Sequence, residues 1–91
     1  MHKYQTSKNL DRILLKLFKK DKKLYENLIK KIEEIVCSYN LEHYKNLQHS
    51  LKDYKRVHIG SFVLVFRYDK LNDLILFADF DHHDNIYQKK F

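Results

Sequence analysis

One change in hydrophobic periodicity, near residue 54, constrains this chain more than any other feature of its sequence. Before it, apolar side chains recur every three or four residues, as they do along one face of an α-helix. After it they alternate, as they do in a β-strand. The chain has no proline and a single glycine, so long irregular loops are not expected. Helices followed by strands in one short chain predict an α+β fold.

Two amphipathic helices are predicted before that change. The first apolar stripe consists of Leu10, Ile13, Leu14, Leu17 and Phe18. The second stripe consists of Leu24, Leu28, Ile32 and Val36. Ser7 and Asp21 precede the stripes as N-cap candidates, because their side-chain oxygens can accept a free backbone N–H. The polar residues 19–23 indicate a corner between the helices, which should therefore form an αα-hairpin.

Four strands complete the predicted fold. They are expected at residues 2–6, 56–59, 62–67 and 74–78. Gly60 and Ser61 signal a tight turn between the second and third strands, and residues 69–73 signal another. We therefore expect the order β-α-α-β-β-β in one domain covering residues 1–91. The αα-hairpin should pack on one face of a mainly antiparallel sheet and leave the other face available for binding.

The composition excludes several classes of protein. No window approaches the roughly 18 apolar residues of a membrane span, and the N-terminus has no apolar signal-peptide core. The one cysteine, Cys37, cannot form an internal disulfide. We therefore expect a cytoplasmic protein in which Cys37 is a small buried hydrophobe.

Positive charge is concentrated in the first part of the chain. The formal net charge is +6. Residues 1–58 contain 14 Lys and Arg against 7 Asp and Glu, a net +7, whereas residues 59–91 contain 4 against 5, a net −1. Basicity confined to one part of a chain favours a polyanionic partner such as RNA, or an acidic protein. Lysine-rich helices are also often only solvated surfaces, so charge alone is weak evidence for a nucleic-acid partner.

The candidate catalytic residues come from the strands. Period-two geometry places Arg56 and His58 on one face of their strand, opposite the side expected to pack on the helices. The last strand runs into a cluster of titratable residues, Asp79, Asp81, His82, His83 and Asp84. Histidine is the side chain best suited to proton transfer near neutral pH. Because the first and third strands of a meander both border the middle one, His58 and the two later histidines could meet in one groove.

Basic side chains near this groove could hold the phosphates of RNA, namely Lys52, Lys55, Arg56 and Arg67. A metal site is the alternative use of the cluster, but its spacing matches none of the zinc or metalloprotease patterns. Alternation should also send neighbours to opposite faces, with His82 pointing away from His83. Each of these residues, taken singly, is more often a solvated or capping group than a catalyst. Their convergence on one face is what favours a site.

Residues 43–87 resemble the RelE/ParE superfamily of toxins, and in particular the RelE-like mRNA interferases and their archaeal members. Residues 56–66, RVHIGSFVLVF, are similar to the family pattern R-x-R-x-G-x-Y-R-x-x-Y. Residues 80–87, FDHHDNIY, are similar to the closing V-G-H-R-x-x-x-Y motif. In element order the resemblance covers nearly the whole chain, and it implies a RelE-like fold.

The resemblance also implies an activity, that of a ribosome-dependent endoribonuclease that cuts mRNA and so inhibits translation. In such an enzyme the ribose 2′-OH attacks the adjacent phosphate without a metal or other cofactor. The implied partners are the ribosome, its mRNA and an acidic RelB-like antitoxin that wraps the toxin. Some members of the superfamily use histidine and aspartate where others use arginine and lysine.

Individual positions carry the resemblance unevenly. Arg56 matches a family arginine and Tyr87 the stacking or catalytic tyrosine, whereas Val63 replaces a strand arginine and cannot bind phosphate. His58 and His83 stand where basic residues are usual, and Asp81 replaces a glycine.

From these matches we expect His83 to act as the general acid and His58 or Asp81 as the general base. Tyr87 would stack on a base of the RNA. The expected phosphate and RNA contacts are Arg56, Lys52, Lys55, Arg67 and His82. Three other functions use the same residues: a metal-dependent phosphodiesterase, a ParE-like toxin that binds a protein such as gyrase, and an RNA-binding module that does not cut.

Overall fold

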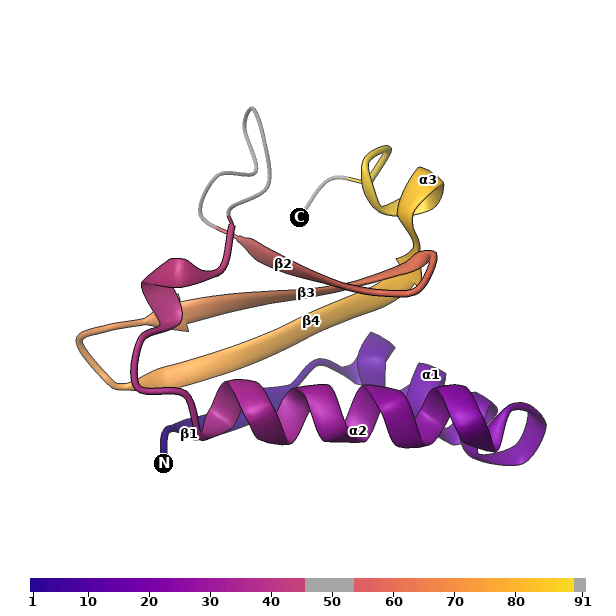
Figure 1. Ribbon diagram of the computed structural model, residues 1–91, viewed down its shortest axis with the longest axis horizontal. Helices are drawn as coiled ribbons and strands as arrows, with labels where there is room; N and C mark the ends of the chain where they lie inside the picture. The colour runs from indigo at the N-terminus through magenta and orange to yellow at the C-terminus, as the bar shows by residue number, and fades with distance from the viewer. Residues whose placement is uncertain (46–53, 90–91) are drawn as a thin grey trace.

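The computed structural model describes residues 1–45 and 54–89 and has two layers, a helical hairpin and a four-stranded sheet (Figure 1). The elements, in chain order, are β1 (Lys3–Thr6), α1 (Lys8–Lys20), α2 (Lys22–Val36), the 3-10 turn η1 (Leu41–His43), β2 (Lys55–Ile59), β3 (Phe62–Asp69), β4 (Leu74–His82) and α3 (His83–Ile86). The predicted α+β order β-α-α-β-β-β is confirmed, and the short helix α3 is an addition that the sequence did not predict.

The sheet has the strand order β1-β4-β3-β2. β2, β3 and β4 form an antiparallel meander, and β1 pairs with β4 in parallel. Between β1 and β4 the chain passes through the αα-hairpin and then through β2 and β3, which gives the long connection that a parallel pair needs. The prediction of a mainly antiparallel sheet is therefore confirmed, with β3 between the two strands that carry the candidate residues.

Both predicted caps begin the helices of the hairpin. The Ser7 hydroxyl accepts the Leu10 N–H at 3.0 Å, and the Asp21 carboxylate accepts the Leu24 N–H at 3.2 Å. The corner is much shorter than residues 19–23, because Asp21 alone separates α1 from α2. Lysines 19 and 20 belong to the last turn of α1, where positive charge interacts favourably with the helix dipole.

The main core lies between the hairpin and one face of the sheet (Figure 1). Its fully buried members include Leu10, Leu28, Ile35, Phe66 and Phe77. Burying a side chain of this kind stabilises a fold by about 1.5–3 kcal/mol. The hairpin is therefore fixed to the sheet, and the strands present a rigid platform on the opposite face.

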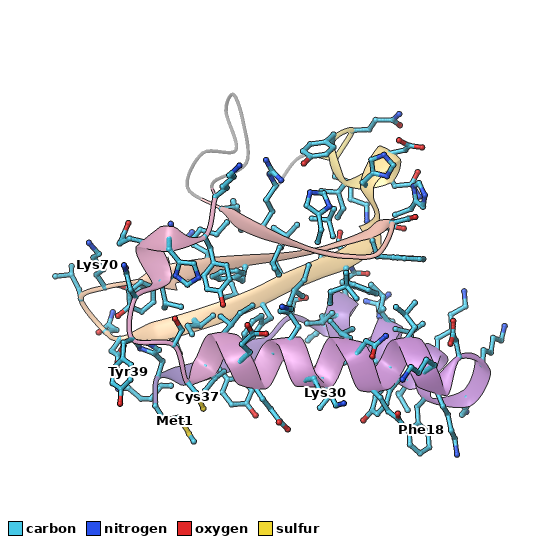
Figure 2. The ribbon with its side chains drawn as sticks, viewed as in Figure 1. Met1, Phe18, Lys30, Cys37, Tyr39 and Lys70 are labelled. Atoms are coloured by element: carbon cyan, nitrogen blue, oxygen red, sulfur yellow. The ribbon has the colours of Figure 1, made fainter. Side chains whose placement is uncertain are left out.

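Some apolar side chains of the hairpin are exposed. Phe18, which the sequence pattern assigned to the packed stripe, is 50% exposed and contacts Tyr25 edge to face. Figure 2 shows Phe18 projecting away from the sheet. The prediction that Cys37 is buried is wrong, because Cys37 follows the last turn of α2 as its C-cap and is exposed.

A second, smaller core lies on the face of the sheet opposite the hairpin, which we call the open face. Val63 and Val65 of β3 pack there with Ile86 of α3, and Tyr54 packs against them. Figure 1 shows α3 on this side of the sheet, away from α1 and α2. The open face is therefore partly covered by the end of the chain.

β4 is longer than the predicted 74–78 and contains an irregularity that decides where its acidic residues lie. Val65 pairs with Asp79 but the next residue, Phe66, pairs with Phe77, so Ala78 is an extra residue on β4. An extra residue of this kind, a β-bulge, reverses the facing of everything after it. Asp79 and Asp81 therefore share the open face with Val65 and Val63.

Among the described residues, no helix is both long and apolar enough to cross a membrane.

Candidate active site on the open face of the sheet

Strand register places the candidate residues of the open face in two rows. Directly paired residues share a face of the sheet. One row is His58, Val63 and Asp81, and the other is Arg56, Val65 and Asp79. The prediction that Arg56 and His58 lie on one face is confirmed, because their neighbours Val57 and Ile59 pack toward the main core.

Arg56, His58 and Tyr87 form the closest group in these rows. The Arg56 Nη1 lies 2.9 Å from the His58 Nε2, and the Arg56 guanidinium carbon lies 6.0 Å from the centre of the Tyr87 ring. Arginine has only donors, so the Nε2 of His58 must be the acceptor and the ring proton must sit on Nδ1. In this contact the Nε2 lone pair of His58 points at the guanidinium.

The Arg56 Nε is buried and has no hydrogen-bond partner in the part of the chain that the structure describes. A buried donor without a partner costs about 1–3 kcal/mol. An oxyanion placed beside this nitrogen would remove that cost. The backbone N–H of Arg56 donates to the Lys45 carbonyl at 2.9 Å, which holds the start of β2 in place.

Asp81 lies on the open face but is already engaged. Lys89 Nζ is 3.0 Å from one of its oxygens, and the Asn85 side-chain amide donates to the other at 3.2 Å. Burial raises the pKa of Asp81, but the hydrogen bonds from Lys89, Asn85 and the His82 N–H outweigh it and hold that pKa below its ordinary value. A carboxylate stabilised in this way is a weak general base.

The two adjacent histidines lie differently from the prediction. Their ring centres are 4.7 Å apart, so the expectation that they point to opposite sides is wrong. The physical reason is that β4 ends at His82 and α3 begins at His83, where period-two alternation no longer applies. The His82 Nδ1 accepts the Asp84 N–H at 3.3 Å and caps α3.

His83 is half-exposed at the start of α3. Its Nε2 lies 3.1 Å from an Asp84 carboxylate oxygen, and its backbone N–H donates to the Ser61 carbonyl at 3.0 Å. One donor atom from each of His82, His83 and Asp84 lies within 4.8 Å of the others, a spacing at which a metal ion could be held. The Tyr87 backbone N–H donates to the His83 carbonyl at 3.4 Å, but the structure gives no contact between the His83 ring and the Arg56–His58–Tyr87 group within the described ranges.

The predicted phosphate ligands are scattered. Lys55 pairs with Phe66, which belongs to the main core, so it lies on the hairpin side of the sheet. Its Nζ is 3.3 Å from the Tyr44 carbonyl and 3.9 Å from Glu42. Arg67 is exposed and, two residues beyond Val65 on β3, belongs to the open face. Lys52 lies outside the described residues.

Asp79 was expected only as one member of a titratable cluster, and its burial and its pairing with Lys89 were not predicted. Asp79 is buried, and its carboxylate accepts hydrogen bonds from the Asn9 side chain at 2.9 Å and from Lys89 at 2.6 Å. An aspartate next to Phe80 in a strand pattern gave only a weak signal of burial. Lys89 gave none, because its position depends on the unpredicted turn of α3.

Comparison with known proteins gives concordant results. No protein-family model matches the chain. A Methanocaldococcus jannaschii protein described as a candidate toxin, RelE4, is 55% identical over 91 residues, which cover 99% of this chain and 95% of that protein.

Two solved structures show the same fold. A chain of the Mycobacterium tuberculosis RelBE2 toxin–antitoxin complex superposes with a TM-score of 0.73 at 17% identity, covering 90% of this chain and 91% of its own. A metal-bound toxin from Helicobacter pylori superposes with a TM-score of 0.66 at 25% identity, covering 94% of this chain and 99% of its own. The motifs around Arg56 and Tyr87 agree with the strand order and with the hairpin on one face of the sheet. They also agree with a relative that is 55% identical over nearly the full length. The chain therefore belongs to the RelE family of toxins of type II toxin–antitoxin systems.

Proposed function

We propose that this toxin is an endoribonuclease that cuts ribosome-bound mRNA and thereby inhibits translation. The observation that carries the proposal is the group formed by Arg56, His58 and Tyr87 on the open face. It combines an imidazole, a cation whose buried Nε has no partner among the described residues, and an aromatic ring on a residue that is 46% exposed. These are the groups needed to accept a proton, bind a phosphate and stack on a base.

The proposed reaction is an internal transfer within the RNA. His58 Nε2 accepts the proton of the ribose 2′-OH, which takes the place that Arg56 Nη1 occupies in the free protein. The 2′-oxygen bonds to the adjacent phosphorus, and the bond from phosphorus to the 5′-oxygen breaks. Arg56 turns to the phosphate, where its guanidinium balances the extra negative charge. His83 gives a proton to the leaving 5′-oxygen, so the products are a 2′,3′-cyclic phosphate and a 5′-hydroxyl.

The remaining contacts follow from position and charge. Tyr87 stacks on a base next to the cut, and Arg67 holds a neighbouring phosphate along the open face. His58 suits the role of base better than Asp81, because Asp81 is occupied by Lys89 and Asn85. Lys55 faces the hairpin side, so we assign the phosphate contacts to Arg56 and Arg67 instead.

The test is cleavage of a defined mRNA on programmed ribosomes, with the same mRNA free in solution as the control. Cuts confined to ribosome-bound mRNA support the proposal. Protection of the mRNA without cuts indicates an RNA-binding module. Loss of gyrase supercoiling without mRNA cleavage indicates a toxin of the ParE kind.

Cleavage should not need a metal held by the toxin. The donors of His82, His83 and Asp84 are close enough to hold an ion, and a similar toxin from Helicobacter pylori was solved metal-bound, so the point needs a direct test. We expect full activity after dialysis of the toxin against EDTA and assay in the Mg²⁺ that ribosomes require. Products should end in 2′,3′-cyclic or 3′-phosphate. Products ending in 3′-OH, or activity restored only by added Zn²⁺ or Mn²⁺, would favour the metal-dependent alternative.

An acidic antitoxin is the proposed partner. The Mycobacterium tuberculosis relative was crystallised in a toxin–antitoxin complex, and the hairpin here exposes Leu15 and Phe18 beside Lys22, whose ammonium lies 5.2 Å from the Phe18 ring centre. An acidic segment with an apolar stripe would match both the charge and the exposed apolar surface.

The association rate with that antitoxin should fall steeply as salt rises, whereas the dissociation rate should change little. Complementary charge accelerates encounter, and the Debye length shortens from about 30 Å at 0.01 M salt to about 8 Å at 0.15 M. Stopped-flow mixing across this range measures both rates. Lys22→Glu should slow association, and Lys70→Glu, remote on the β3–β4 turn (Figure 2), is the matched control. An association rate independent of salt would contradict the prediction that complementary charge accelerates antitoxin binding.

A further inference from the structure

The segment that carries Tyr87 is weakly built on its own. α3 is one turn long, and the residues after it are held to it by backbone hydrogen bonds of 3.1–3.4 Å, from Tyr87 to His83, Gln88 to Asn85 and Lys89 to Ile86. An isolated turn of helix is unstable in water because its first hydrogen bond orders several residues at once. Something outside the segment must therefore hold it on the sheet.

Ile86 provides part of that attachment by packing with Val63 and Val65. The other part is ionic. The Lys89 Nζ lies 2.6 Å from Asp79 and 3.0 Å from Asp81, so one ammonium bridges two carboxylates of β4. Ile86 and Lys89 stand on either side of Tyr87, which leaves the Tyr87 ring little freedom to move away from the sheet.

The Asp79 carboxylate makes this attachment specific. Its side chain is 4% exposed, and its partners are the Asn9 amide from α1, the Phe80 N–H and Lys89. A buried carboxylate without a cation is strongly unfavourable, so Asp79 draws Lys89 to one place. Partial burial lowers the pKa of Lys89, but hydrogen bonds and the charges of Asp79 and Asp81 outweigh it and raise that pKa above its ordinary value.

We propose that Lys89 is a positioning residue, whose bridge to Asp79 and Asp81 holds Tyr87 over Arg56 on the open face. The bridge fixes the segment, the segment places the aromatic ring 6.0 Å from the guanidinium carbon, and Arg56 in turn contacts His58 at 2.9 Å. Lys89 itself touches none of the three. The part of this inference that concerns catalysis rests on the proposed function.

Lys89→Met removes the charge and keeps most of the length of the side chain. We expect hydrogen exchange of the Tyr87, Gln88 and Lys89 amides to speed up in this variant, and that of the β3 amides to stay unchanged. The single-turnover cleavage rate should fall by about 10- to 100-fold, since a misplacement of about 1 Å can cost that much. The KM for programmed ribosomes should change less than the rate, because Arg56 and Arg67 remain.

Lys89→Arg keeps the charge and should restore both exchange protection and cleavage. Lys70→Met is the matched control, because it removes a lysine whose ion pair, with exposed Glu42 at 2.9 Å, lies away from the Lys89 bridge. It should behave as the parent. If Lys89→Met does not fold, the double variant Lys89→Met with Asp79→Asn removes the unpaired buried charge as well. That variant should fold and show the same loss of protection and rate.

The two proposals fail in different ways. Unchanged exchange of the Tyr87–Lys89 amides in Lys89→Met would overturn the positioning role, whether or not the parent cleaves mRNA. Faster exchange with a parental cleavage rate would also overturn it, because Tyr87 would then not need the bridge. A parent protein that cuts no mRNA would overturn the proposed function alone, and the exchange measurements would still decide whether Lys89 holds the segment.

Discussion

Replacing His58 by alanine should lower the single-turnover rate of mRNA cleavage on programmed ribosomes by about 100- to 10,000-fold. A well-placed general base contributes an effect of that size, and the Arg56 Nη1 lies 2.9 Å from the His58 Nε2 that would accept the proton. The ring is on an exposed strand position, so the substitution should change the free energy of unfolding by only about 0.5 kcal/mol or less. Rapid-quench measurement of the cut fraction against time gives the rate directly.

His43→Ala is the matched control for that experiment. His43 is an exposed histidine of η1 whose ring packs on Tyr44, a side chain that belongs to the main core and not to the open face. It should cleave at the parental rate. If His58→Ala also cleaves at the parental rate while Arg56→Ala does not, then charge stabilisation is essential and the proton is removed by another group, such as water.

The fold could be predicted from the sequence because its determinants are local. Leu10 and Leu28 stand in helical stripes with Ser7 and Asp21 at their starts, and these caps form as predicted. The alternation around Val57 likewise determined which side of β2 packs toward the helices. Local periodicity thus specifies both the elements and the face that each one buries.

The site could be predicted only in part, because two of its determinants are not local. The extra residue Ala78 turns Asp79 and Asp81 onto the open face, and nothing in the sequence around it signals a bulge. The end of β4 at His82 depends on the start of α3, which is too short to leave a periodic pattern. These two features explain why the Lys89 bridge was missed and why His82 and His83 were expected to point to opposite sides.

One difference between this sequence and the family pattern has a structural explanation. Val63 stands where the resemblance places a strand arginine, and in this chain it is fully buried against Ile86. A phosphate-binding arginine could not occupy that place without displacing α3. The packing of α3 on the middle strand therefore occupies the place of that arginine. In the proposed reaction the charge of the transition state would be balanced by Arg56, whose Nε has no partner among the described residues.

The proposed general acid, His83, is also exposed. His83→Ala should lower the single-turnover cleavage rate by about 100- to 10,000-fold, because an unassisted 5′-oxygen is a poor leaving group. His83 has a side chain that is 47% exposed and no place in either core, so folding stability should change by about 0.5 kcal/mol or less. Antitoxin binding should persist, since that interface is expected to spread over many residues.

The control must distinguish the effect of losing the His83 imidazole from the effect of disturbing the residues around it. His82→Ala would not do so cleanly, because His82 caps α3 and lies against the His83 ring. Asp84→Asn is better, since it removes the carboxylate 3.1 Å from His83 Nε2 but leaves the imidazole in place. We expect this variant to retain most of the activity, because the proposed proton donor is unchanged. If His83→Ala cleaves at the parental rate, another group protonates the leaving 5′-oxygen. If Asp84→Asn is the variant that loses activity, cleavage depends on the Asp84 carboxylate and not on the His83 imidazole.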